Sequence, residues 1–193
     1  PNLADGVVSD ADRIVEYTVT FTEPVQSVVE GDISVTGGSL ITNTLQPLND
    51  PITQVSFRVE ADDASDVSLV VSVGGQVKDL NGNALVVSDS APVEVDTINP
   101  DAPVIVVTDG AATQAEAGSG VFSVTGEVGS SIAVTLTGAN STVVNKVING
   151  DGSAQTVTLS SQDVADLGEG SVTITATQTD AVGNLHSGSV VTS

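Results

Sequence analysis

The feature that most constrains this chain is a repeated alternation of apolar and polar residues. Over residues 15–22 the odd positions hold Val, Tyr, Val and Phe, and the even positions hold Glu and Thr. Because successive side chains of a strand point to opposite faces, this run predicts a half-buried β-strand. The same alternation returns at 55–59, 67–73, 132–136 and 172–176. The expected fold class is therefore all-β.

Turn residues between these runs indicate the architecture. Clusters of Gly, Pro, Asn and Asp recur about every 8–12 residues, which gives about seven short strands in each half. That spacing is typical of an immunoglobulin-like β-sandwich. A hairpin is expected at Asn149-Gly-Asp-Gly152, since both glycines tolerate a positive φ. A single helical turn is expected at 162–167.

Some segments are expected to lack regular structure or to end a strand. Residues 1–13 and 108–120 have a loop-like composition, rich in Asp in the first case and in Gly and Ala in the second. Glu23-Pro24 is expected to end the first long strand, because proline cannot donate a hydrogen bond to a central ladder.

An acidic stretch with two prolines lies near the middle of the chain. It is Val95-Asp-Thr-Ile-Asn-Pro-Asp-Ala-Pro103, and β-patterned sequence flanks it on both sides. We interpret it as a stiff joint between two tandem immunoglobulin-like β-sandwich domains arranged end to end, at residues 1–97 and 98–193. The motif Asp-x-x-Gly-Asn occurs late in each half, at 79–83 and 180–184, which is a weak internal repeat.

The charge of the chain argues against some classes of binding partner. The chain has 25 Asp and Glu against 4 Lys and Arg, a formal net charge of −21. Such a surface repels nucleic acid and anionic membranes, because no basic patch exists to release counterions.

No apolar run is long enough to span a bilayer, and Pro1 opens directly into polar sequence without a signal-peptide pattern. We therefore expect an interior segment of a longer secreted chain, and since cysteine is absent, a bound cation is a candidate staple.

Several stretches resemble bacterial immunoglobulin-like repeats. In the first half they are Tyr17-Thr-Val-Thr-Phe-Thr-Glu-Pro-Val25 and Gly31-Asp-Ile-Ser-Val-Thr-Gly-Gly38. The second half resembles a different repeat class, through Asp163-Val-Ala-Asp-Leu-Gly-Glu-Gly170 and the run 172–184. The joint, Asp96-Thr-x-x-Pro100-x-x-Pro103, is similar to the linkers between such repeats. Together these stretches cover nearly the whole chain.

The resemblance implies an extender repeat of a large RTX-type, type I-secreted adhesin or biofilm protein. The implied role is a stalk segment at the bacterial cell surface that projects a distal binding region. The implied partners are calcium ions and the neighbouring repeats of the same chain. Many such stalks bind calcium at their domain junctions, which makes them rigid. The segment itself is expected to be a monomer with no nucleic-acid partner and no membrane insertion.

Calcium is bound by oxygen from carboxylates, Asn side chains and carbonyls. Alternate loops of an immunoglobulin-like sandwich gather at opposite poles, so the 62–66 loop and the 180–184 loop are both expected to face the joint. The first candidate ligands are Asp96, Asp101 and Asp180. The other candidates, at the joint or at the free ends of the domains, are Asn184, Asp62, Asp63, Asp66, Asp79, Asn81, Asn83, Asp5 and Glu116. Each could equally be an ordinary turn residue, where Asp, Asn and Gly are favoured.

Other functions find less support in the residues. The chain is not expected to be an enzyme: His186 is its one histidine, no Gly-x-Ser-x-Gly motif occurs, and among 25 acids any carboxylate pair is uninformative. The alternative function is a ligand-binding adhesin module for a sugar, a peptide or ice. An intramolecular isopeptide bond would require a buried lysine, and only Lys78 and Lys146 are available.

Overall fold

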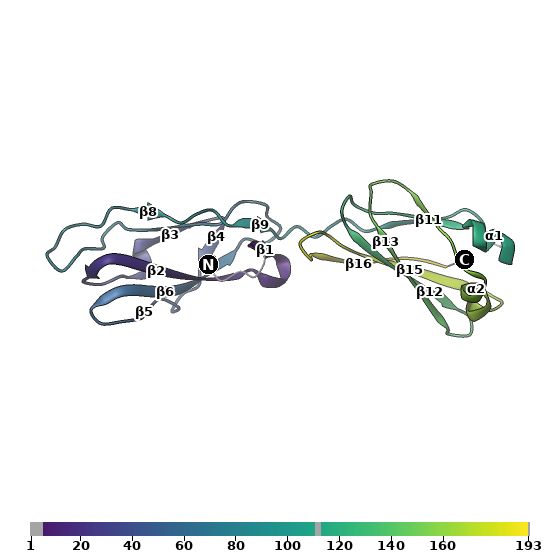
Figure 1. Ribbon diagram of the computed structural model, residues 1–193, viewed down its shortest axis with the longest axis horizontal. Helices are drawn as coiled ribbons and strands as arrows, with labels where there is room; N and C mark the ends of the chain where they lie inside the picture. Colours follow the sequence, from purple (N-terminus) through teal and green to yellow (C-terminus); the bar gives the residue numbers. More distant parts are fainter. Residues whose placement is uncertain (1–5, 111–112, 193) are drawn as a thin grey trace. The chain divides into compact units, whose positions relative to one another are not determined.

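The structure, a computed structural model, describes residues 6–110 and 113–192 (Figure 1). It divides into two compact units, Pro1–Ile98 and Asn99–Ser193. Both consist mainly of strands in several sheets, so the all-β prediction is confirmed. Among the described residues, no helix has the length and apolar character needed to cross a bilayer.

Unit 1 is a sandwich of two sheets and one additional strand pair. One sheet has the order β2-β6-β4, with β5 also paired to β6, and the other has the order β3-β7-β8. A parallel pair joins β1 to β9. The strands are β1 (Val7–Ser9), β2 (Ile14–Val25), β3 (Ile33–Thr36), β4 (Gly38–Leu40), β5 (Gln46–Pro47), β6 (Ile52–Ala61), β7 (Val70–Val73), β8 (Ser88–Asp89) and β9 (Glu94–Asp96).

The core of unit 1 follows the alternation seen in the sequence. Inward residues of β2 and β6 are buried together, and the rings of Tyr17 and Phe57 stack with their centroids 5.9 Å apart. The expected inward row at 67–73 holds for its last three members but not for Val67, which is 52% exposed. The reason is local: β7 begins only at Val70, and Val67 belongs to a turn in which its N–H donates to the Ser65 hydroxyl.

Two expectations for unit 1 are wrong. Residues 1–13 were expected to be a loop, but Val8 is fully buried in β1, which pairs with β9, and a 3₁₀ turn follows at Asp10–Asp12. Pro24 does not end β2, which continues to Val25. The pairing with β6 changes register between Thr20 and Val25, so the proline lies in an irregular part of an edge strand, where its missing N–H is tolerated.

Unit 2 is also a two-sheet sandwich, with the orders β10-β11-β14 and β13-β12-β15-β16. Its apolar core includes Phe122, Val124, Ile132, Val134 and Leu136, as the sequence pattern predicts. Two short helices lie at the same end of the unit (Figure 1). The elements are β10 (Val104–Val107), α1 (Gln114–Ser119), β11 (Phe122–Thr125), β12 (Ser131–Gly138), β13 (Val143–Asn149), β14 (Gln155–Val157), α2 (Ser161–Leu167), β15 (Val172–Thr179) and β16 (Leu185–Thr192).

The helix α1 lies in a segment that was expected to be a loop. Its N-terminus is a capping box: the Thr113 hydroxyl accepts from the Glu116 N–H, and the Glu116 carboxylate accepts from the Thr113 N–H. Ala117 is buried on the inner side of the helix. The sequence signal was therefore the Thr-x-x-Glu spacing, which the Gly and Ala content obscured.

The expected hairpin at 149–152 is also wrong. β13 pairs with β12 and β14 pairs with β11, so these residues carry the chain from one sheet to the other. The Gly150 N–H donates to the Ser130 carbonyl, and the Gly150 carbonyl accepts from the Gly129 N–H, at 2.8 and 2.9 Å. Of the two glycines only Gly152 has a positive φ, at 79°. Gly150 is required for a close backbone approach, which produces the same sequence signal as a tight turn.

The two units place equivalent strands differently. In unit 1 the fourth strand, β4, pairs with β6 and so joins the sheet that contains the second strand, β2. In unit 2 the fourth strand, β13, pairs instead with the third strand, β12. The first strands also differ: β10 pairs antiparallel with the second strand of its unit, whereas β1 pairs with the last strand of its own. Sandwich domains can share an architecture without sharing the exact strand topology.

We expect Gly150→Ala to destabilise unit 2 by about 1–3 kcal/mol, the cost of overpacking a closed site. An added Cβ would overlap the Glu127 carbonyl oxygen and the Ser130 hydroxyl. The matched control is Gly110→Ala, where an added Cβ meets nothing within 4 Å. Urea unfolding, followed by NMR signals of unit 2, measures both; equal midpoints for the two variants would contradict the close-approach explanation.

Candidate functional site

The two Asp-x-x-Gly-Asn loops have one geometry and one place in the fold. Each connects a central strand to the strand after it, β7 to β8 in unit 1 and β15 to β16 in unit 2. Asp79 Oδ1 accepts from the N–H groups of Asn81 and Asn83 at 2.8 and 2.7 Å, and its Oδ2 accepts from Asn83 Nδ2 at 2.7 Å. The aspartate N–H closes the loop by donating to the Asn83 carbonyl at 2.9 Å.

The loop of unit 2 repeats this arrangement. Asp180 Oδ1 accepts from the N–H groups of Val182, Gly183 and Asn184, at 2.9, 2.8 and 2.9 Å. Asp180 Oδ2 accepts from Asn184 Nδ2 at 2.8 Å, and Asn184 is 1% exposed. Glycine is needed at the fourth position because φ is +88° at Gly82 and +99° at Gly183.

These contacts give the two aspartates a role in folding. N–H groups that converge on a carboxylate favour its ionised form, and the pKa of Asp79 is lowered, first by the Asn83 side chain and then by the Asn83 N–H. The donors also occupy part of the space around Oδ1 that a cation would need. Calcium binding at Asp79, Asn81, Asn83, Asp180 and Asn184 stays a prediction, and any ion would have to use oxygen directions that the loop leaves open.

The acidic turn at 62–66 is fastened from within unit 1. The Thr97 hydroxyl donates to the Asp62 carbonyl at 2.9 Å and accepts from the Ser65 N–H at 2.9 Å. Arg13 forms ion pairs with Asp63 at 2.9 Å and with Glu60 at 2.7 Å. The side chains of Asp62 and Asp66 are exposed. Of the three carboxylates proposed here as ligands, Asp63 is therefore already neutralised by a cation of the protein.

Asp96 and Asp101 lie on different units. Asp96 ends β9, and its Oδ1 accepts from the Ile98 N–H at 3.3 Å. Asp101 is exposed, and its carbonyl oxygen accepts from Gln178 Nε2 at 3.0 Å. Because Gln178 lies on β15 shortly before Asp180, the Asp101 backbone is held at the end of unit 2 from which the 180–184 loop emerges.

Gln178 is the residue that sequence reasoning missed. It is 1% exposed, and its Oε1 accepts from the Glu127 N–H at 2.9 Å and from the Ser130 hydroxyl at 3.2 Å. With the Asp101 contact, one buried amide joins three segments of unit 2. The available signal was its position: it continues the inward row of Val172, Ile174 and Ala176, where a polar residue requires partners.

The remaining candidates have local roles or lie outside the described residues. Glu116 Oε2 accepts from the Thr113 N–H and hydroxyl at 2.8 and 2.6 Å, and these bonds lower its pKa. Asp5 lies outside the described residues. Within the parts of the chain that the structure describes, no group of three or more His, Cys, Asp or Glu side chains is arranged to hold a metal ion.

The comparisons with known proteins find a likeness among solved structures. A solved structure described as a tetra-tandem repeat in the extending region of a large adhesion protein is 20% identical, with a TM-score of 0.42. The alignment covers 97% of this chain and 48% of that one, so the chain spans about half of its length. A likeness at this level does not establish a shared function. No family model and no curated protein matches the chain.

We expect Asp180→Ala to destabilise unit 2 by about 1–3 kcal/mol, because several backbone N–H groups lose their acceptor. The graded control is Asp151→Ala, since among the described residues Asp151 accepts from one backbone N–H, that of Ser153. Thermal unfolding in calcium-free buffer provides the measurement. An effect of Asp180→Ala no larger than that of the control would show that the loop does not need its internal acceptor.

A second prediction concerns Asp163, at the N-terminus of α2. Lys146 Nζ donates to it at 2.6 Å and the Ser160 N–H at 2.7 Å, which lowers its pKa from 3.8 to about 2. A pKa that is lower in the folded chain stabilises unit 2 at pH values above 3.8, and this stabilisation is lost as the pH falls toward 2.

Lys146→Met should therefore raise the pKa of Asp163 toward 3.8, because the lysine is the largest cause of the shift. Carbon-detected NMR titration of the carboxyl groups measures this value. Glu116, whose carboxylate is held by the Thr113 N–H and hydroxyl, is the internal control and should titrate unchanged.

Proposed function

We propose that this chain is a structural extender: a stalk segment of a large bacterial cell-surface adhesin, outside the cell, that projects a distal binding region. The observation that carries the proposal is that the chain forms two successive sandwich units, each with its own apolar core. Their acidic loops are fastened by internal hydrogen bonds. Modules of this kind supply length and can be repeated, because each folds around its own core.

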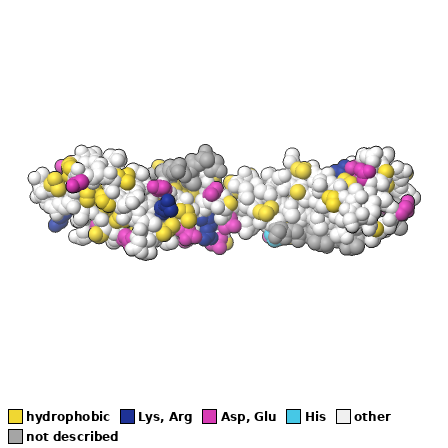
Figure 2. Space-filling model, turned by 90° about the horizontal axis from the view of Figure 1, so that it is seen from below, with side chains coloured by type: hydrophobic (Ala, Val, Ile, Leu, Met, Phe, Trp, Pro, Cys, Tyr) yellow, Lys and Arg dark blue, Asp and Glu magenta, His cyan; other side chains and the backbone are white. Residues whose placement is uncertain are grey.

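The surface charge supports a segment that stays apart from other molecules. With a formal net charge of −21, like chains repel one another, and solubility is high. On the face drawn in Figure 2, acidic side chains lie scattered over both units, with few basic side chains among them. The proposed partners are accordingly the neighbouring repeats of the same chain, and the segment is proposed to be a monomer.

Calcium is the second part of the proposal. The support comes from the sequence, which places Asp96 and Asp101 in a stretch with two prolines, and from the exposure of Asp101. Carboxylate oxygens are suitable ligands for Ca²⁺, a hard ion that prefers oxygen. We propose that Ca²⁺ binds Asp96, Asp101 and the 180–184 loop, restricts bending of residues 97–103, and also stabilises the folded chain by mass action.

The test is small-angle scattering of the chain in calcium and then in chelator. Calcium should give a sharply bounded distance distribution, and the chelator should broaden it. Asp96→Asn with Asp101→Asn should abolish the difference. The matched control, Asp12→Asn with Glu169→Gln, removes as many charges at exposed positions and should preserve it. Identical profiles with and without calcium would refute the calcium proposal and leave the extender proposal to be tested by the repeat content of the whole protein.

A further inference from the structure

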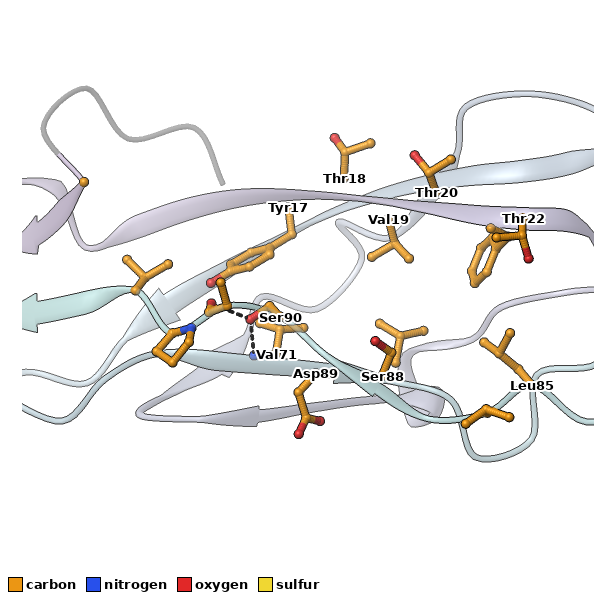
Figure 3. A pocket seen from close by; sticks show the side chains of 17 residues that line it. Tyr17, Thr18, Val19, Thr20, Thr22, Val71, Leu85, Ser88, Asp89 and Ser90 are labelled. Carbon is orange, nitrogen blue, oxygen red and sulfur yellow. Dashed lines mark hydrogen bonds between the residues drawn. The ribbon is translucent and has the colours of Figure 1, made fainter.

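Unit 1 carries an open apolar groove beside β2, with a volume of about 700 Å³. Tyr17, Val19 and Phe21 of β2 line one side, and the segment from Leu85 to Val93 lines the other. In Figure 3, Tyr17 and Val19 point from β2 toward that segment, whereas Thr18 and Thr20 point away from it. The groove thus opens the core of the sandwich between its two sheets.

Several apolar side chains at the groove are exposed to solvent. Val86 lines it and is 85% exposed, and Val19 and Leu85 are only half-buried although they pack against the core. The Tyr17 hydroxyl is buried and makes no hydrogen bond of standard geometry. Burial raises the pKa of Tyr17, and the nearby Ser90 side chain partly opposes that shift. A buried polar atom without a partner is uncommon in a completed core.

Alternate backbone groups of β2 face away from its partner strand β6. The Ala61 N–H donates to the Arg13 carbonyl, so Arg13 directs its carbonyl toward β6. Glu16 pairs with Arg58 of β6. The Arg58 carbonyl accepts from the Ile41 N–H, on the side of β6 that faces away from β2. Since alternate residues of an antiparallel strand bond to opposite sides, the other set of β2 directs its N–H and C=O groups to the free edge. That set includes Glu16, Thr18 and Thr20.

Unit 2 shows what covers the equivalent edge. There the first strand, β10, pairs antiparallel with the second strand, β11, from Val104–Thr125 to Val107–Phe122. In unit 1 the first strand pairs with β9, and the described residues provide no strand for the outer edge of β2 at residues 16–20. A single bridge joins the last residue of β2, Val25, to Asp79. β10 has the sequence Val-Ile-Val-Val, β-branched and uncharged. An acidic strand would suit the groove of unit 1 less well, because Asp89 lines it and Glu16 lies on the free edge.

We propose that this groove binds an extended, uncharged, β-branched strand that is donated by an adjoining module of the same protein and adds antiparallel to β2. The main chain of the strand would pair with Glu16, Thr18 and Thr20, and its alternate side chains would enter the groove, as in β-strand addition. Gly6 itself lines the groove, so a module that precedes unit 1 can deliver a strand there. The identity of the donor rests on the proposed extender function.

The test uses the whole chain and a peptide that copies Pro103–Thr108 followed by two lysines. Tyr17 is the sole tyrosine and there is no tryptophan, so tyrosine fluorescence reports the groove directly. Peptide binding should change this fluorescence and slow the hydrogen exchange of the Glu16, Thr18 and Thr20 amides at least about tenfold. No change at millimolar peptide, or protection of β13 amides instead, overturns the proposal.

Two variants locate the binding site. Thr18→Pro removes an outward N–H on an edge strand, which a sheet tolerates, and should weaken binding at least about tenfold. The matched control, Val147→Pro, makes the same change on β13, the edge strand of unit 2 where Val147 is 73% exposed, and should bind normally. If Thr18→Pro does not fold, Val86→Asp at the exposed rim should weaken binding several-fold instead.

Equal affinity of the wild-type chain and the groove variants overturns the proposal. So does amide protection that appears without peptide and grows with protein concentration, since the occupant would then be a second copy. These outcomes are independent of the scattering experiment: a groove that binds no strand leaves the calcium effect intact, and a chain without a calcium effect can still bind the peptide.

Discussion

Burial of alternate apolar side chains between two sheets is the interaction on which both units depend. The inward rows are formed by Val, Ile and Leu with only four aromatic residues in the whole chain, so each core is thin and needs both sheets to exclude water. The acidic loops lie at the margins of these cores. The position of each loop is therefore fixed by the strands from which it emerges.

Acidic residues organise those margins by accepting hydrogen bonds over short distances. Asp79 and Asp180 fold their own loops, Glu116 and Asp163 cap helices, and Asp63 pairs with Arg13. Although the chain as a whole is strongly negative, these individual carboxylates stabilise the structure around them. The extender proposal assigns calcium to two further carboxylates, Asp96 and Asp101, near the middle of the chain.

The period-two pattern was enough to predict the all-β fold and most inward rows, because it records directly which side chains avoid water. It could not predict which strands pair with one another. The glycines at 149–152 produce the same signal for a hairpin and for a crossing between sheets, since what distinguishes them is the pairing of β13 and β14 with strands of different sheets. For the candidate site, the sequence located the acidic loops. It could not show that their oxygens face N–H groups, or that Gln178 joins three distant segments.

Gln178 also determines how unit 2 would respond to tension. A pull on the chain ahead of unit 2 meets the bond between the Asp101 carbonyl and Gln178 Nε2 before it meets β10, which is an edge strand. Gln178 belongs to β15, which lies between β12 and β16 in the interior of its sheet. The force is therefore shared with a strand that is paired on both sides, and the edge strand is protected from being peeled away one hydrogen bond at a time.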